Sequence, residues 1–253
     1  METIEKRADG TTVETVESAS GEITASVSVP KSVGSTRVDI PVSKPTGSMV
    51  AVIVHPDGTE EIVKGSIVTE TGIALRAEGD VRLKIIDNAK RFNDMADHWA
   101  KDAVEFASSR ELFNGVGNDA FGPDRSMTRG MVSTVLARLA GADTAGGETW
   151  YAKGTAWAVE NGITNGMTET TFAPNATCTR GQSVTFLYRA LKGTASGSAN
   201  FTDVKSDTFY ADAINWAVAN NVTNGTSNTT FSPNADCTRA EIVTFLYRAY
   251  QGK

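Results

Sequence analysis

Three arginines in the second half of the chain recur at one position, and each directly follows a threonine: Arg129, Arg180 and Arg239. A threonine before a helical apolar pattern is a typical N-cap, so each arginine would lie in a first helical turn, where the helix dipole makes a cation mildly unfavourable. A guanidinium beside free helix-terminal amides forms a pocket that suits a carboxylate or a phosphate. The alternative is an ion pair with an Asp or Glu of a neighbouring segment, and the sequence leaves both interpretations open.

The residues around these arginines recur in three copies with constant spacing. In each copy Phe-x-Pro begins six residues after the glycine of an Asn-Gly pair, and the arginine lies eight residues beyond that Phe. An aromatic residue stands sixteen residues before each of these glycines: Trp99, Trp150 and Phe209. An exposed tryptophan stacks on sugars, whereas a buried one belongs to the core, and both roles stay open. The candidate ligand-binding residues are Arg129, Arg180, Arg239, Glu241, Asn114, Gly115, Asn165, Gly166, Asn224, Gly225, Trp99 and Trp150.

Catalytic and metal-binding motifs are absent from the sequence. It contains no G-x-S-x-G, no G-x-x-x-x-G-K and no H-E-x-x-H. The two histidines, His55 and His98, lie far in sequence from the two cysteines, Cys178 and Cys237. We therefore expect no catalysis, no bound metal and no cofactor. The cysteines occupy the same position in adjacent copies, where Met127 stands in the first copy, and this exchange with methionine predicts buried free thiols.

The composition is that of a globular protein with room for one or two cores. Of the 253 residues, 40% are hydrophobic and 21% are charged, and the net charge is −6. This acidity argues against a nucleic-acid-binding protein, which normally carries an excess of Lys and Arg. No apolar run approaches the roughly 20 residues of a membrane-spanning helix, and residues 1–6 lack the apolar segment of a secretion signal.

Each copy is predicted to form two helices around a loop. The first helix, for example at residues 210–220, carries small and aromatic residues at helical spacing. The loop holds the Asn-Gly and Phe-x-Pro elements, and the second helix opens at the threonine. In the third copy Glu241 stands three residues after Thr238, which predicts a capping box. Gln182 can act in the same way in the second copy, whereas Met131 cannot in the first.

Residues 22–88 show the period-two alternation of half-buried strands. Apolar and polar residues alternate over 23–29, 38–42 and 81–85, and Asp57-Gly58 is a hairpin turn between two further apolar runs. We predict a small antiparallel β-sandwich of about six strands for residues 22–89. Residues 1–21 are polar, show no hydrophobic period, and are predicted to be a flexible linker.

The predicted fold class is therefore α+β multidomain, with the β-sandwich followed by three mainly helical repeats. The predicted bounds of the repeats are 90–142, 143–198 and 199–253. Glycine-rich stretches at 141–147 and 193–198 separate them.

The repeat resembles the S-layer homology (SLH) domain, which occurs as three tandem copies in bacterial surface proteins. The resemblance covers roughly residues 91–250 and rests on Phe92-Asn93-Asp94 before Trp99, Phe201-Thr202-Asp203 before Phe209, and the Asn-Gly, Phe-x-Pro and Thr-Arg-Gly/Ala elements. It implies a pseudo-threefold trimer of units around a helical bundle, with grooves that bind secondary cell-wall polysaccharide without a covalent link. The family's ligand is typically an anionic saccharide with a pyruvate ketal, and the resemblance assigns the anion contact to the arginines of the Thr-Arg motif.

This sequence departs from the family pattern in two places. The Glu of the Thr-Arg-Ala-Glu motif is present as Glu241, but Met131 and Gln182 replace it in the other copies. The Phe-x-Asp segment is missing before Trp150. We therefore expect the three grooves to be unequal.

The resemblance implies non-covalent anchoring of a surface protein to a bacterial cell wall, through a peptidoglycan-linked polysaccharide. The expected location is extracellular, at the wall or S-layer, so the sequence would begin downstream of an export signal. No nucleic-acid partner and no transmembrane segment are expected, and the oligomeric state is left open. The alternative is a surface assembly or adhesion protein that binds protein partners or host glycans. An enzyme whose catalytic part is the β region is the third hypothesis, and the motif search disfavours it.

Overall fold

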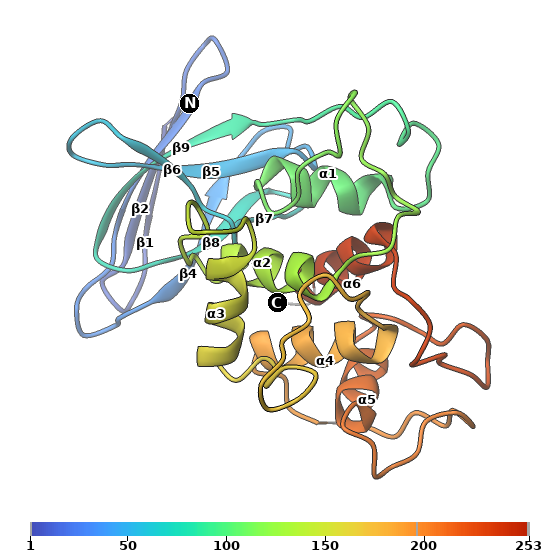
Figure 1. Ribbon diagram of the computed structural model, residues 1–253. Helices are drawn as coiled ribbons and strands as arrows, with labels where there is room; N and C mark the ends of the chain where they lie inside the picture. Colours follow the sequence, from blue (N-terminus) through green and yellow to red (C-terminus); the bar gives the residue numbers. More distant parts are fainter. Residues whose placement is uncertain (1, 196, 252–253) are drawn as a thin grey trace. The chain divides into compact units, whose positions relative to one another are not determined.

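A computed structural model describes residues 2–195 and 197–251 (Figure 1). Its contacts divide the chain into two units. The β unit comprises the residues up to Arg91 together with Glu105–Phe113, and the repeat unit comprises Phe92–Val104 and the chain from Asn114 onward.

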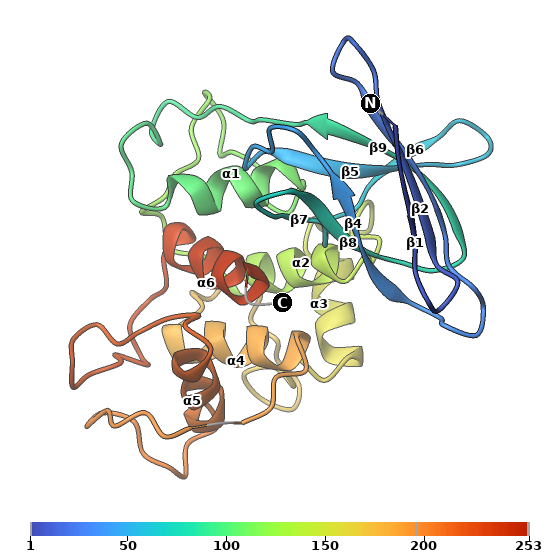
Figure 2. The same cartoon turned by 180° about the vertical axis from the view of Figure 1, so that it is seen from behind.

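The strands of the β unit form two antiparallel sheets (Figures 1 and 2). The larger sheet has the strand order β1-β2-β3-β9-β5-β6, and the smaller has the order β4-β8-β7. The strands are β1 Glu2–Lys6, β2 Thr12–Glu17, β3 Ile23–Ser28, β4 Thr36–Pro41, β5 Met49–Val54, β6 Glu60–Ile62, β7 Ile67–Val68, β8 Gly72–Ala77 and β9 Asp80–Asp87. Seven of these nine strands, β3 to β9, lie within residues 22–89, for which the sequence predicts about six.

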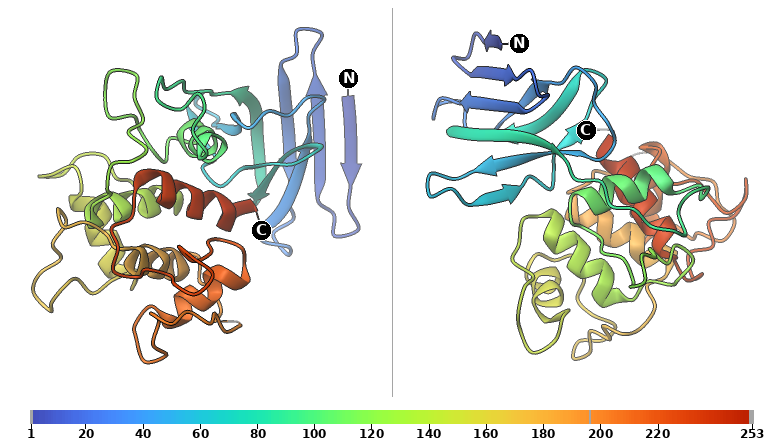
Figure 3. Two further views of the ribbon diagram at one scale, coloured as in Figure 1. Left: turned by 90° about the vertical axis from the view of Figure 1, so that its right-hand side faces the viewer. Right: turned by 90° about the horizontal axis from the view of Figure 1, so that it is seen from above.

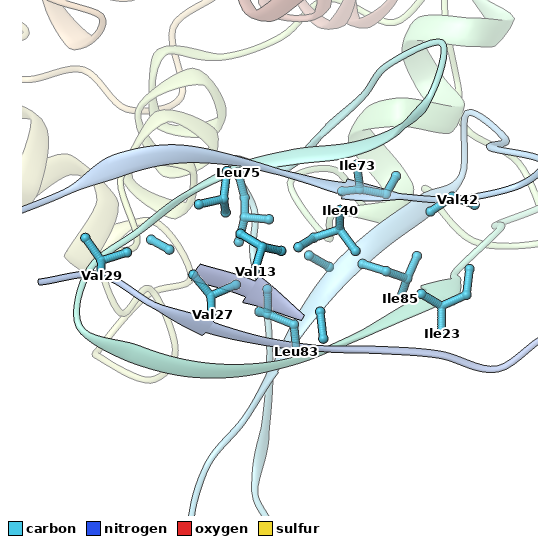
Figure 4. Packing of buried hydrophobic residues seen from close by; sticks show 14 residues of the cluster. Val13, Ile23, Val27, Val29, Ile40, Val42, Ile73, Leu75, Leu83 and Ile85 are labelled. Atoms are coloured by element: carbon cyan, nitrogen blue, oxygen red, sulfur yellow. The ribbon is translucent and has the colours of Figure 1, made fainter. Parts of the chain in front are cut away.

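The predicted alternation places the apolar side chains of both sheets in one cluster. In β3, Ile23, Ala25 and Val27 are buried, while the residues between them are exposed. Figure 4 shows members of the cluster from the larger sheet, Val13, Ile23, Val27, Leu83 and Ile85, and from the smaller sheet, Ile40, Ile73 and Leu75. The shared cluster explains why the strands predicted around 23–29, 38–42 and 81–85 form.

The predicted hairpin turn at Asp57-Gly58 is confirmed. β5 pairs with β6, and Gly58 has a φ of +84°. The Asp57 carboxylate accepts a hydrogen bond from the Thr59 amide at 2.9 Å, as expected of an Asx turn.

The prediction of a flexible linker at residues 1–21 was wrong. β1 and β2 occupy most of this segment, and β2 pairs with β3 along its whole length. In β2 only Val13 and Thr15 are buried on the inner face, and polar residues alternate with them. Two inward positions are too few to show a hydrophobic period, and threonine, a strong β-former, stands in one of them.

A buried arginine holds the segment after α1 within the β unit. Arg110 is fully buried, and its Nε donates to the Ser66 carbonyl at 2.7 Å. Its Nη2 donates to the Met49 carbonyl at 3.2 Å, and its guanidinium lies 4.0 Å from the centre of the Phe106 ring. These contacts explain why Glu105–Phe113 groups with the strands.

Each repeat contains the two predicted helices. They are α1 Lys101–Ser109 and α2 Arg129–Leu139, α3 Ala152–Glu160 and α4 Arg180–Ala190, and α5 Ala211–Ala219 and α6 Arg239–Gln251. The predicted N-caps are also confirmed. Thr179 and Gln182 form a capping box, and the Glu241 carboxylate accepts from the Thr238 amide at 2.9 Å while Thr238 Oγ1 accepts from the Glu241 amide at 3.2 Å.

The second helices of the three repeats pack against one another (Figure 1). A cavity of about 10 Å³ is lined by residues of α2, α4 and α6, among them Val135, Leu187 and Phe245. The longest helix in the described part of the chain is α6, with 13 residues, and no described helix is long and apolar enough to cross a membrane.

Candidate ligand-binding site

Backbone hydrogen bonds join the three repeats in a closed cycle. The Cys178 amide donates to the Met127 carbonyl at 2.8 Å, the Cys237 amide donates to the Cys178 carbonyl at 3.1 Å, and the Met127 amide donates to the Cys237 carbonyl at 3.0 Å.

Both cysteines are free and buried, which confirms the prediction of buried free thiols. Burial raises the pKa of the Cys178 thiol to about 11 and raises that of Cys237 further, so both thiols are protonated near neutral pH.

The first amides of the second helices are not free, contrary to the premise of the anion pocket. The Arg129 amide donates to the Ala176 carbonyl at 2.9 Å, and the Gly130 amide donates to the Pro174 carbonyl at 2.8 Å. Both acceptors lie in the loop of the next repeat. The same pattern continues around the cycle, from Arg180 to Ala235, Gly181 to Pro233, Arg239 to Arg125 and Ala240 to Pro123. The helix N-termini therefore bind protein carbonyls and not a ligand at these positions.

The three arginine side chains enter the loop of the next repeat in the cycle. Arg129, Arg180 and Arg239 are only 1%, 5% and 7% exposed. The Nε of each donates to the carbonyl of the Phe in the neighbouring Phe-x-Pro element, at 3.0, 3.1 and 3.0 Å. Each guanidinium also lies over that Phe ring, 5.0, 5.0 and 4.4 Å from the ring centre. Each arginine thus links two successive repeats, and we call its contacts with the neighbouring Phe ring and carbonyl groups a clasp.

The Nη2 atom of each arginine binds at or beside the Asn-Gly pair of the neighbouring repeat. Arg239 Nη2 donates to the Asn114 carbonyl at 2.7 Å, Arg180 Nη2 to the Asn224 carbonyl at 3.4 Å, and Arg129 Nη2 to Thr164 Oγ1 at 3.2 Å. The side chains of Asn114, Asn165 and Asn224 are exposed. The backbone of these loops is thus structural, whereas their amide side chains are accessible.

The glycines of the Asn-Gly pairs are required by packing. A Cβ on Gly115, Gly166 or Gly225 would lie 2.8, 2.7 or 2.3 Å from a carbonyl oxygen of the same loop. Gly166 also has a φ of +99°. Their recurrence therefore has a structural explanation, and a ligand contact at these glycines stays a prediction.

The charge on Arg180 is balanced by Glu241, whereas the other two positions differ. Arg180 forms an ion pair with Glu241 of the next repeat, so the ion-pair alternative is correct at this boundary. Gln182 and Met131 stand at the positions equivalent to Glu241. Desolvation lowers the pKa of Arg129, and desolvation with the nearby positive charge of Arg125 lowers that of Arg239 to about 10. Both guanidiniums therefore stay charged at neutral pH.

The aromatic residues sixteen positions before the loop glycines lie on the surface. Trp99 is 64% exposed, Trp150 is 52% exposed and Phe209 is 61% exposed, so the core interpretation of the two tryptophans is wrong. Trp150 directly precedes Tyr151, whose Cβ would lie 3.2 Å from a Cβ on Gly130. This places the Trp150 segment beside the start of α2. Phe209, which stands in the same register as the tryptophans and is equally exposed, was not among the predicted ligand-binding residues.

Comparison with known families identifies the repeats. Residues 91–130, 143–182 and 200–243 each match the S-layer homology domain. The chain carries three SLH domains. The resemblance of the three repeats to the SLH domain is confirmed.

Parts of this chain are also similar in sequence to individual known proteins, among them surface-layer and anchoring proteins. The Surface-layer 125 kDa protein of Lysinibacillus sphaericus is 38% identical over 93 residues, which cover 37% of this chain and 8% of that protein. The Cellulosome-anchoring protein of Acetivibrio thermocellus is 31% identical over 129 residues, covering 45% and 29%. The Amylopullulanase of Thermoanaerobacterium thermosulfurigenes is 28% identical over 204 residues, covering 74% and 11%. The chain thus spans between 6% and 29% of the length of the curated relatives that it matches.

The Phe-x-Asp segments of the first and third SLH domains have a clear structural role. The Asp94 carboxylate accepts from the Phe121 and Gly122 amides at 2.8 and 2.7 Å, and Asp203 makes the equivalent pair in the third domain. Partial desolvation would raise the pKa of these carboxyl groups, but the backbone donors outweigh it, so the pKa of each is lowered. Each Asp fixes the loop whose Phe carbonyl binds an arginine of another SLH domain. The middle domain lacks this Asp, although Ala173 in its loop has a positive φ, as Gly122 and Ser232 have at the equivalent positions.

Proposed function

We propose that the three SLH domains anchor the protein non-covalently to a cell-wall polysaccharide, as a binding module without catalytic activity. The polymer is anionic, of the pyruvylated secondary type, and is held in grooves between successive domains related by a pseudo-threefold axis. The similarity to surface-layer and cellulosome-anchoring proteins supports cell-surface anchoring. The observation that carries the proposal is the exposed aromatic residue at the same position of each domain. The arginines that recur in the three domains are buried instead.

The candidate residues divide into two roles in this proposal. Trp99, Trp150 and Phe209 offer exposed ring faces on which a sugar stacks. The exposed asparagine amides of the loops offer donors and acceptors for its hydroxyl groups. The arginines, whose Nε atoms bind carbonyl groups, hold the loops and act on the ligand through their charge. A poorly solvated cation attracts an anion more strongly than a solvated one.

The three boundaries differ in charge, and this difference predicts which of them favour an anion. At the boundary between the second and third domains, Glu241 neutralises Arg180. The equivalent residues at the other two boundaries, Gln182 and Met131, carry no charge. We therefore propose that the boundaries with Arg129 and Arg239 bind the acidic group of the polymer more tightly than the boundary with Arg180.

The β unit serves in this proposal as a spacer or cargo domain. Its two sheets and shared apolar cluster suit a small β-sandwich. None of the chain's Phe, Tyr and Trp residues falls within residues 1–91, so this region lacks the ring faces that carry sugar stacking in the repeats.

Cell walls isolated with and without their polysaccharide test this function. We expect the purified protein to bind the intact walls and to lose binding once the polysaccharide is removed. Trp150→Ala should weaken wall binding severalfold with a change in unfolding free energy below about 0.5 kcal/mol, because the ring is exposed.

Val159→Ala is the matched control, because it shortens an exposed apolar side chain of α3 in the same domain. It should leave wall binding unchanged. Wall binding that survives removal of the polysaccharide would contradict the proposal and favour a protein partner. Equal wall binding by Trp150→Ala and the wild type would show that the Trp150 ring does not contact the polysaccharide.

A further inference from the structure

The first strand of the larger sheet has an open edge. β1 lies at the edge of this sheet and pairs with β2 on one side (Figure 3). All five of its residues are exposed. The Arg7 amide donates to the Thr11 carbonyl at 2.9 Å, and Arg7 and Thr11 continue the register in which Lys6 stands opposite Thr12. Antiparallel hydrogen bonding alternates along a strand, so Glu5 and Thr3 also face β2. The backbone N–H and C=O groups of Glu2, Ile4 and Lys6 therefore point away from the sheet.

Other edges of the two sheets are protected or short. β6 has three residues and β7 has two. β4 ends in Pro41, and its Arg37 carbonyl accepts a hydrogen bond from the Arg7 guanidinium. β1 has neither a proline nor such a bond in its described residues, so it is the edge best suited to add another strand.

The sequence of β1 is complementary to itself in the antiparallel direction. With a twofold axis at Ile4, Glu2 of one copy stands opposite Lys6 of the other, and this pairing occurs twice. Ile4 stands opposite Ile4, and both pairings use residues whose backbone groups face outward. Glu2 and Lys6 have no ion-pair partner among the described residues, so their charges are available for this contact.

The exposed apolar side chains of this region lie at the same place. Ile4 is 55% exposed and Val16 is 46% exposed. Ile4 stands opposite Glu14 in β2, so Val16 is its diagonal neighbour on the same face of the sheet. A second copy paired at β1 would cover Ile4 with its own Ile4.

We propose that β1 pairs antiparallel with β1 of a second copy of this chain, centred on Ile4. The pair forms about six backbone hydrogen bonds, two for each of the three outward-facing residues. The two larger sheets then join into one. A strand pair of this length covers less than the roughly 1,000 Å² of a stable interface, so the dimer is weak and depends on protein concentration.

Sedimentation velocity of the whole chain over a concentration series tests this proposal. The apparent mass should rise from 26.8 kDa towards twice that value. Lys6→Glu places two Glu-Glu contacts in the interface and should weaken the dimer at least about tenfold. Glu2→Lys should do the same, and the double variant Glu2→Lys/Lys6→Glu should restore the wild-type dissociation constant to within about threefold.

Ile4→Pro gives a second test that spares the fold. The Ile4 amide faces away from β2, so proline removes a donor of the interface without removing a hydrogen bond of the sheet. It should abolish the dimer, whereas circular dichroism should be unchanged. A wild-type protein that stays monomeric at every concentration overturns the proposal. A dimer that persists in Ile4→Pro also overturns the proposal. So does a double variant Glu2→Lys/Lys6→Glu whose dissociation constant is not restored to the wild-type value.

Discussion

The first 91 residues and the rest of the chain differ in the kinds of side chain that they bury. All ten Phe, five Tyr and four Trp residues lie after residue 91. The first 91 residues bury mainly Val, Ile, Leu and Ala from alternating strand positions. The SLH domains instead bury three arginines at their boundaries, each against a Phe and a backbone carbonyl of another domain. The apolar core tolerates exchanges of similar volume, whereas the polar clasps depend on particular donors and acceptors.

The largest effect is expected from removing one of these clasps. Arg239→Ala leaves the carbonyl groups of Phe121 and Asn114 without this donor and should cost about 4 kcal/mol of unfolding free energy. Urea unfolding followed by tryptophan fluorescence measures the loss, because every tryptophan lies in the SLH domains. Arg125→Ala, which alters a neighbouring arginine, is the control. A loss below about 1 kcal/mol would show that the clasp contributes little.

A core deletion in the β unit should cost slightly less. Ile40 is fully buried between the two sheets, and Ile40→Ala should lower the unfolding free energy by about 3 kcal/mol. Ile40→Val should cost about 1 kcal/mol, since it removes one methylene group. Urea unfolding followed by far-ultraviolet circular dichroism measures both. Equal costs for the two variants would contradict a tightly packed apolar core.

The pH dependence of the SLH domains should show a smaller effect. The pKa values of Asp94 and Asp203 are lowered by folding, so their contribution to stability is present above the unfolded pKa of about 3.9 and is lost as the pH falls through the folded value. The unfolding temperatures of the wild type and of Asp94→Asn/Asp203→Asn should therefore differ near neutral pH, and the difference should narrow progressively as the pH falls below about 4. A gap that stays constant down to about pH 3 would show that these carboxylates do not act through their charge.

Short-range patterns in the sequence identified much of the fold. The alternation at Ile23–Ser28 and the threonine caps of the second helices depend on residues within a few positions of one another, and both were predicted correctly. β1 and β2 were missed because Val13 and Thr15 are the only inward positions of β2.

The site was harder to predict than the elements that form it. The periodicity located the three arginines, but their acceptors lie far along the chain: Arg239 binds the Phe121 and Asn114 carbonyls, 118 and 125 residues away. No local sequence pattern shows that the first amide of a helix donates a hydrogen bond to a loop carbonyl of a distant segment. The exposure of Trp99 and Trp150 was also not predictable, because the spacing of a tryptophan in the turn before a helix does not show which way its side chain points.

The charge at the boundary between the second and third SLH domains tests the central claim most directly. Glu241→Gln removes the negative charge beside Arg180 but keeps a side chain that can cap α6, as Gln182 caps α4. Equilibrium binding of the purified wall polysaccharide should be measured for this variant and the wild type, before and after its acidic groups are removed. If the boundaries bind an anionic polymer, Glu241→Gln should bind the acidic polymer about threefold to tenfold more tightly and the neutral polymer equally. Unchanged or weaker binding of the acidic polymer by the folded variant would contradict the account.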